Sequence, residues 1–139
     1  MSRRVLVPVD GSELATRALE YALDVHADDH VTLLYVAGEA SPMMGSATSL
    51  ALEADVEGAI AEEAEEVFGP AREVAEEYGV EVSFEVGVGK PASVIVEHAE
   101  NHDVVVLGSH SSTLRERLFV GNVATKVVRN APVPVTVVR

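Results

Sequence analysis

The feature that most constrains the fold of this chain is a regular alternation between apolar, β-branched runs and segments with helical periodicity. Five runs are expected to form strands, at residues 4–9, 30–37, 80–86, 103–107 and 133–138. One helix is expected to follow residue 12 and to end near residue 25, and three others are expected at about residues 50–78, 91–101 and 122–129. Strands separated by helices are joined by right-handed crossovers, which make neighbouring strands parallel. The sequence therefore predicts an α/β fold of the Rossmann-like or flavodoxin-like, doubly wound type, with a five-stranded parallel sheet and helices on both faces.

Three local patterns refine this prediction. The first helix is expected to bury one face, formed by Leu14, Ala18, Tyr21, Ala22 and Val25. Gly69 and Pro70 are expected to kink or break the second helix, because proline has no amide hydrogen to donate. Apolar and polar residues alternate over residues 80–86, which indicates a strand near an edge of the sheet.

Length and composition limit the class of protein. A chain of 139 residues suits one domain, and no linker or internal repeat interrupts the alternation, so we expect a single domain over residues 1–139. Apolar residues make up 47% of the chain, which excludes intrinsic disorder. No apolar run approaches the roughly 18 residues of a membrane span, and the N-terminal MSRRVLVPVD enters the first strand directly, so we expect a cytoplasmic protein. The sequence has no cysteine, which excludes disulfides, thiol nucleophiles and thiolate metal sites.

The charge balance narrows the set of partners. Twenty-three acidic and ten basic side chains give a net charge of −13, and most of the excess lies in residues 53–77. Such a surface repels phosphate backbones and anionic lipids, so we expect binding to neither nucleic acid nor membrane. Few lysines together with many Glu, Ala and Val residues resemble the composition of proteins from salt-accumulating halophiles, which predicts that folding needs high salt. An ordinary acidic cytosolic protein is the alternative.

Ligands of an open parallel sheet bind outside the carboxyl ends of the strands, where the strand order reverses. If the first and fourth strands flank that point, the loops at residues 7–12 and 108–123 meet there. The second loop ends at a helix N-terminus, which attracts anions and which Asn122 is expected to cap, and Arg115 and Arg117 add positive charge. This combination predicts a phosphate site. Asp10 is expected to contact a ligand, to cap the first helix, or both, with Ser12 as the alternative cap.

Several stretches of the chain resemble the universal stress protein family. The run Gly108-Ser109-His110-Ser111, then Gly121-Asn122 nine residues later, and the following residues 123–135 are similar to the most specific part of that family. The opening VLVPVDGSE is similar to the family's first strand and aspartate turn, and GKPASVIVEHAENHDVVVLGSH to its third helix and fourth strand. The resemblance covers essentially the whole chain.

The resemblance implies an adenine-nucleotide site. Nucleotide-binding members carry glycine, two residues, glycine, nine residues, glycine, and then serine or threonine. Gly108 and Gly121 match the first and third glycines, whereas Ser111 and Asn122 replace the second glycine and the hydroxyl residue. By resemblance, adenine and ribose are held by Asp10 and the backbone around Pro8, Val9 and Val36, and the phosphates are lined by Gly108, His110, Ser111, Gly121, Asn122 and Val123. The implied ligand is ATP, with magnesium or manganese accompanying its phosphates and no covalently bound cofactor.

Two functions follow from these observations. The first is a stress-response or regulatory protein that binds ATP without dedicated catalysis. The only candidate pair of base and nucleophile is Asp10 with His110, so slow ATP hydrolysis is the most activity that we expect. The alternative is a dimeric interaction module of the same fold that has lost nucleotide binding. In either case an apolar edge formed by residues Val133–Val138 predicts a homodimer, as in the family, and the sequence identifies no other protein partner.

The remaining histidines are expected to be structural. His98 and His102 have the i, i+4 spacing of two zinc ligands on one helix, but no third ligand is evident in the sequence. We therefore expect solvated helix side chains, and the same holds for His26 and His30 in a surface turn. No metal site is predicted.

Overall fold

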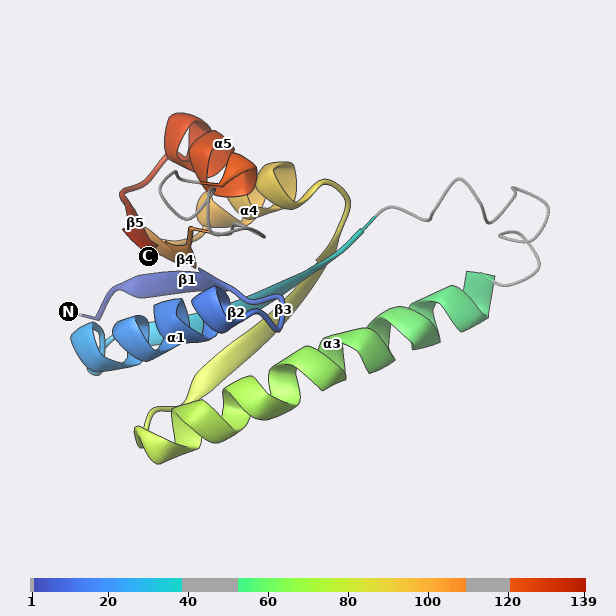
Figure 1. The fold of residues 1–139 in the computed structure, drawn as a ribbon, viewed down its shortest axis with the longest axis horizontal. Coiled ribbons are helices and arrows are strands. Elements are labelled where there is room, and N and C mark those ends of the chain that lie inside the picture. Colours follow the sequence, from blue (N-terminus) through green and yellow to red (C-terminus); the bar gives the residue numbers. More distant parts are fainter. Residues whose placement is uncertain (1, 39–52, 110–120) are drawn as a thin grey trace.

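The computed structural model describes residues 2–38, 53–109 and 121–139, and it confirms the predicted alternation (Figure 1). The elements, in chain order, are β1 (Arg4–Pro8), α1 (Glu13–Val25), β2 (His30–Ala37), α3 (Glu53–Glu77), β3 (Val82–Val88), α4 (Pro91–Ala99), β4 (Val104–Gly108), α5 (Asn122–Asn130) and β5 (Val135–Val138). The strands form one sheet in the order β3-β2-β1-β4-β5, and every pairing is parallel. The chain leaves β1 for β2 on one side and later returns to β4 on the other, so the strand order reverses between β1 and β4.

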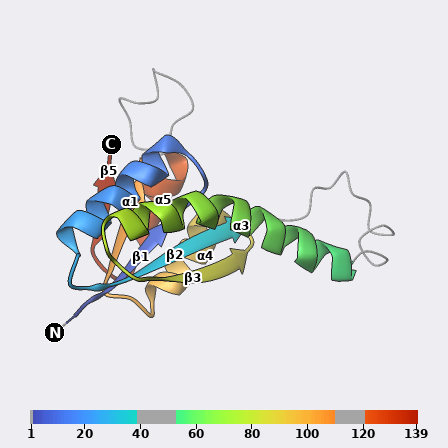
Figure 2. The same cartoon turned by 90° about the horizontal axis from the view of Figure 1, so that it is seen from below.

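Helices cover both faces of the sheet (Figures 1 and 2). The alternation along β1 shows how the two layers form. Val5 and Val7 are fully buried against α1 and α3, whereas Leu6, between them, is fully buried against α4 and α5. Because successive side chains of a strand point to opposite faces, an apolar run without polar interruption builds two cores at once. Among the described residues, no helix combines the length and the apolar character that crossing a membrane would need.

The buried face of α1 differs from the prediction. The residues that face the core are Ala15, Ala18, Leu19, Ala22 and Leu23. Tyr21 and Val25, predicted to be buried, are 41% and 54% exposed. The helix carries two overlapping apolar stripes, and the sheet takes the one with two leucines, which leaves the polar tip of the tyrosine in water.

The break that was one of the two outcomes predicted for the second helix at Gly69 and Pro70 is also absent from this described helix. Helix α3 runs from Glu53 to Glu77 with Pro70 inside it. Proline removes one helical hydrogen bond, but buried residues on both sides of Pro70 pack on the sheet: Ala64, Phe68, Ala71 and Ala75. Tertiary packing on both sides holds the helix together across the proline.

Element ends shift by a few residues. Strand β3 starts and ends later than predicted, because Gly87 and Val88 pair with Val36 and Ala37 and the turn begins at Gly89. It lies at one edge of the sheet, as predicted, and β5 lies at the other. Helix α4 ends at Ala99, before the expected position, because the next amides bond to carbonyls three residues back.

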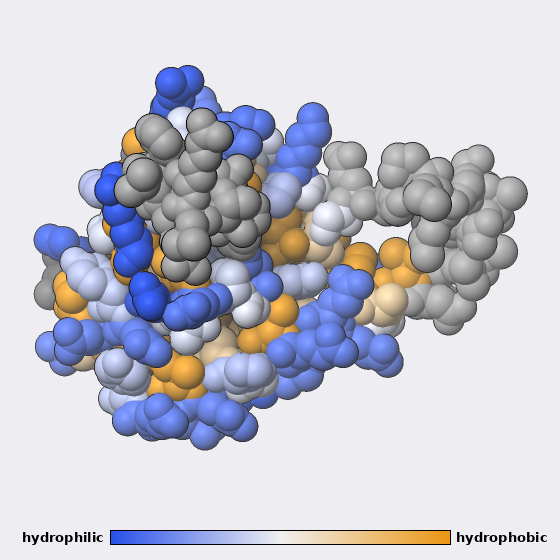
Figure 3. Space-filling view, viewed as in Figure 1, coloured by the Kyte–Doolittle hydropathy of each residue, from blue (hydrophilic) through white to orange (hydrophobic). Residues whose placement is uncertain are grey.

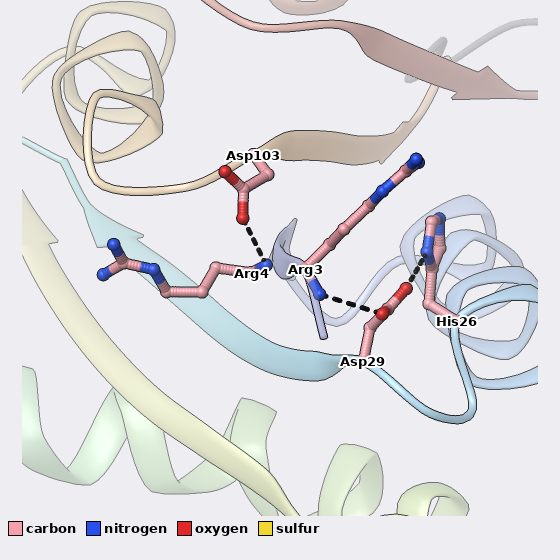
Figure 4. A network of polar contacts seen from close by, with 5 residues as sticks. All are labelled: Arg3, Arg4, His26, Asp29 and Asp103. Carbon is pink, nitrogen blue, oxygen red and sulfur yellow. Dashed lines mark hydrogen bonds and ion pairs between the residues drawn. The ribbon is translucent and has the colours of Figure 1, made fainter. Parts of the chain in front are cut away.

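The amino ends of the central strands are tied together by two aspartates (Figure 4). Asp29 precedes β2, and its Oδ1 accepts a hydrogen bond from the Arg3 amide at 2.9 Å. Asp103 precedes β4, and its Oδ2 accepts from the Arg4 amide at 2.7 Å. The Oδ2 of Asp29 also lies 2.8 Å from Nδ1 of His26, at the end of α1. The amide of Arg3 and then His26 lower the pKa of Asp29, since both favour the charged carboxylate.

Candidate functional site

A pocket of about 250 Å³ lies at the carboxyl ends of β1, β2 and β4, where the strand order reverses. This is the place at which sheets of this topology bind ligands. Its walls are mainly apolar, and its lining consists of Pro8, Val9, Asp10, Ser12, Leu14, Ala15, Leu34, Val36, Pro91, Ile95, Leu107, Gly108 and Val123. Of these described lining residues, Asp10 is the only charged one. We call it the switch-point pocket.

Three helices begin at the switch-point pocket, and their first turns differ in capping. Helix α1 is capped by Ser12, whose Oγ accepts a hydrogen bond from the Ala15 amide at 3.2 Å. The N-caps of α4 and α5 are Lys90 and Gly121, and neither has a side-chain cap bond. First-turn amides without a cap, together with the helix dipole, favour an anion. Val123 places the first turn of α5 directly in the pocket lining.

The cap of α5 differs from the prediction. Gly121 is the N-cap, with an extended backbone, and its carbonyl accepts from the Thr125 amide at 2.9 Å. Asn122, predicted to be the cap, is the first residue of the helix. The sequence favoured asparagine because of its side-chain oxygen, but here the backbone conformation sets the helix start one residue earlier.

Asp10 shapes the turn after β1. Its Oδ1 accepts a hydrogen bond from the Ser12 amide at 2.9 Å, and Gly11 between them has φ +83°. This is an Asx-type turn, which needs a residue that tolerates positive φ at the second position. Ser12, and not Asp10, is therefore the helix cap. The turn presents the exposed Asp10 carboxylate beside the apolar walls of the pocket.

Gly108 is required by close packing. A Cβ atom at this position would lie 2.7 Å from the carbonyl oxygen of Leu14 and 2.8 Å from its carbonyl carbon. Leu14 belongs to the first turn of α1, so the missing side chain lets the end of β4 approach that backbone. No local sequence pattern indicates this contact, because the two residues are 94 positions apart (108 − 14).

The structure brings most of the predicted site residues together. Six of them line the switch-point pocket: Pro8, Val9, Asp10, Val36, Gly108 and Val123. Gly121 and Asn122 immediately precede Val123 at the start of α5. His110 and Ser111 lie outside the described residues, as do Arg115 and Arg117.

The sequence reasoning missed other residues of the pocket, above all Pro91 and Ile95 of α4. A helix was expected to begin at Pro91, but only the sheet order places this helix beside β2 and β1. Leu34 and Leu107 were also missed as lining residues. Leu107 is the next-to-last residue of β4, a position that could have identified it, whereas Leu34 lies in the middle of β2 and reaches the pocket because it pairs with Pro8 at the end of β1.

His26, His98 and His102 are partly or fully buried and not solvated as predicted, whereas His30 is exposed, as predicted. His102 lies beyond the end of α4, is buried, and has its Nδ1 2.8 Å from the carbonyl oxygen of His98. The Nδ1 of His98 is 2.9 Å from Oε2 of Glu85 on β3. The ring of His30 lies 3.0 Å from Oγ of Ser83. Over the described ranges of the chain, no group of three or more acidic or histidine side chains is arranged to hold a metal ion.

Comparison with known proteins gives a consistent result. The profile of the universal stress protein family matches residues 1–139. A universal stress protein of Methanocaldococcus jannaschii is 33% identical over 141 aligned residues, which cover 99% of this chain and 82% of that protein. The solved structure of a second protein of that organism superposes with a TM-score of 0.80 at 28% identity, and the match covers 99% of this chain and 96% of that one.

Two more distant solved structures contain adenine nucleotides. A universal stress protein from Arabidopsis thaliana holds AMP; it is 22% identical, with a TM-score of 0.66 over 98% of this chain and 90% of that one. A universal stress protein from Archaeoglobus fulgidus holds dAMP; it is 21% identical, with a TM-score of 0.65 over 100% of this chain and 98% of that one. At these identities the likeness concerns the fold alone.

Proposed function

The chain belongs to the universal stress protein family, and we propose that it binds an adenine nucleotide in the switch-point pocket as a regulatory, stress-response protein without dedicated catalysis. The observation that carries the proposal is the convergence of apolar strand ends, the Asp10 turn and the first turn of α5 on one pocket. Relatives of the same fold that hold AMP and dAMP support a ligand of this class. The proposed setting is a cytoplasmic homodimer.

Each part of the switch-point pocket suits one part of a nucleotide. The apolar residues Val9 and Val36, at the ends of β1 and β2, line the place proposed for a purine ring. Ribose hydroxyls are donors, and the Asp10 carboxylate is an acceptor with more than one lone pair. The phosphates suit the first turn of α5, where anions are favoured. A magnesium or manganese ion would enter with the phosphates, because the described lining supplies a single carboxylate and no histidine.

The proposal assigns no catalytic residue. Asp10 is the single acidic side chain in the described lining, and its Oδ1 is engaged by the Ser12 amide. The chemistry that the described lining can support is therefore limited, with slow ATP hydrolysis as its upper limit. A binding protein acts by a difference in ligand affinity between conformations or assemblies, which needs no turnover.

The proposal is tested by isothermal titration of ATP with magnesium at high salt. The wild-type protein is expected to bind in the micromolar range. Asp10→Asn keeps an oxygen that accepts from the Ser12 amide but loses the charge, so we expect about tenfold weaker binding. Asp24→Asn makes the same chemical change on the exposed side of α1, away from the pocket, and is expected to bind like the wild type.

The alternative function, an interaction module without a nucleotide, is favoured by Ser111 and Asn122, which depart from the nucleotide-binding pattern. The Ser111→Gly variant separates the two functions in the same titration. Binding by the wild-type protein would overturn the alternative. Binding by the variant alone would overturn our proposal in favour of the module, and binding by neither would overturn nucleotide binding in this pocket.

The proposed homodimer uses residues Val133–Val138. In the described part of the sheet, β5 pairs with β4 on one side and forms the edge on the other. Its four residues are only half-buried, although the side chains of Val135 and Val137 pack on the core of α4 and α5. A second copy of the strand would cover this edge. Sedimentation equilibrium is expected to give a dimer, and a monomer at all concentrations would contradict it.

A further inference from the structure

We propose that the edge strand β3 is a docking site for an extended segment of another protein, with alternating apolar and basic residues, which adds to the sheet as a sixth strand. This inference goes beyond nucleotide binding and does not depend on it. It rests on three properties of the β3 edge: open backbone groups, exposed apolar side chains, and the negative charge of the helix beside it.

The backbone groups of β3 are open on one side. In the described part of the sheet, β3 pairs with β2 and with no other strand, and it forms the margin of the sheet in Figure 2. The Gly89 amide donates to the Ala37 carbonyl at the end of β2 at 3.0 Å. Because backbone groups alternate along a strand, those of Val82, Phe84, Val86 and Val88 point to the open edge. Seven residues of strand thus offer a template for a further strand.

The same alternate residues expose apolar side chains. Phe84, Val86 and Val88 are 36%, 45% and 58% exposed, and they lie on the α3 side of the sheet, where the ring of Phe84 packs 4.9 Å from that of Phe68. Figure 3 shows apolar surface near the carboxyl end of β3, bordered by the hydrophilic side chains of α3. The strand contains neither lysine nor proline, the residues that commonly protect an edge from pairing.

Helix α3 makes the surroundings of this edge negative. It carries ten acidic residues and one basic residue, Arg72. The Arg72 guanidinium lies 4.8 Å from the centre of the Phe84 ring and bonds to both carboxylate oxygens of Glu65, at 2.9 and 3.4 Å. The one basic side chain of α3 is therefore already paired, and the helix as a whole has a net charge of −9 (1 − 10).

The negative charge of α3 favours a basic segment of another protein over a second copy of the chain at the β3 edge. A second copy of the chain that paired at this edge would place a second acidic α3 against the first. A basic segment gains attraction from the glutamates, while its apolar residues cover Val86 and Val88. In strand addition, main-chain hydrogen bonds give affinity, and the alternating side chains determine which segments bind.

The experiment uses two synthetic ten-residue peptides, one alternating valine and lysine and one alternating valine and glutamate. Binding to the full-length protein is measured by isothermal titration at the lowest salt concentration at which thermal melts show the protein folded, because molar salt would screen the selection by charge. We expect the lysine peptide to bind in the micromolar range and the glutamate peptide at least tenfold more weakly. Hydrogen exchange followed by NMR is expected to show new protection at the amides of Phe84, Val86 and Val88, and none at Glu85, which already faces β2.

A matched pair of variants locates the site. The double variant Val86→Lys/Val88→Lys is expected to bind the lysine peptide at least tenfold more weakly. Val128→Lys, at a valine of α5 that is 51% exposed, is expected to bind it like the wild type. Thermal melts of both variants check that they are folded. Equal binding of the two peptides, or unchanged binding by the double variant, would overturn the proposal. Self-association of the protein that the double variant abolishes would also overturn it, in favour of a second copy.

Discussion

The two ends of the sheet use the same central strands in opposite ways. At the amino ends, Asp29 and Asp103 each close a short connection between a helix and a strand, and each accepts a hydrogen bond from an amide at the start of β1. At the carboxyl ends, the strands lead to helix N-termini that surround a pocket of about 250 Å³. Side-chain acceptors at the amino ends thus tie the strands together, whereas among the described residues the N-termini of α4 and α5 have no side-chain cap.

Among the changes that would test the difference between the two ends of the sheet, removal of salt is expected to have the largest effect on stability. With a net charge of −13, the folded chain repels itself, and the screening length grows from about 3 Å at 1 M salt to about 10 Å at 0.1 M. We expect the melting temperature to fall steeply on transfer from molar to low salt. Hydrogen exchange is expected to rise first at the start of α5 and last at Arg3 and Arg4. A melt that is independent of salt would contradict the prediction.

Gly108→Ala tests the packing of the carboxyl end of β4 against the first turn of α1. The new Cβ would meet the backbone of Leu14, which cannot move aside as a flexible side chain can. We expect a loss of about 2 kcal/mol in the free energy of unfolding, measured by urea denaturation. Gly58→Ala in α3 is the control, because no atom lies within 4 Å of its added Cβ. That variant is expected to be neutral or stabilised by up to about 1 kcal/mol, and equal stability of the two variants would refute the packing argument.

Asp103→Ala tests the hydrogen bond between Asp103 and the Arg4 amide at the amino ends of the strands. It removes the acceptor of the Arg4 amide, and we expect a loss of about 1 kcal/mol in the free energy of unfolding. Asp103→Asn retains an oxygen that can accept the same bond and is expected to lose less. Nucleotide affinity is expected to be unchanged in both, because the substitution lies at the other end of the sheet. Weaker nucleotide binding by Asp103→Asn would show that the two ends are coupled.

Acid is expected to weaken the hydrogen bond between the Asp29 carboxylate and the Arg3 amide, with a smaller effect on stability than the loss of the Asp103 side chain. The pKa of Asp29 is below its usual value of 3.8 in the folded protein, because the Arg3 amide and His26 stabilise the carboxylate. Its contribution is therefore complete above the usual pKa and is lost as the pH falls through the lower, folded-state pKa. We expect the difference in melting temperature between wild type and Asp29→Asn to narrow as the pH is lowered from 5 to about 2. A difference that stays constant over this interval would exclude the tie.

Local patterns in the sequence determined the order of the elements, the parallel sheet, the edge position of β3 and the loops that flank the switch-point pocket. Hydrophobic periodicity and turn residues act over a few neighbouring positions, so they can be recognised without a structure. Pro8, Val9 and Asp10 could be assigned to one site because they lie where the first strand ends, whereas Val36 was assigned by resemblance to the family. The resemblance to a family added the expectation of adenine, which no local pattern contains.

Only the tertiary structure decided which stripe of α1 is buried, why position 108 is glycine, and which groups tie the strands at their amino ends. Asp103 and the Arg4 amide are 99 positions apart, and neither has a local pattern that indicates the other. The exposure of Tyr21 and the burial of His102 likewise depend on which elements pack against them. Such contacts join parts of the chain that meet only after the crossovers form, and for that physical reason local periodicity could not predict them.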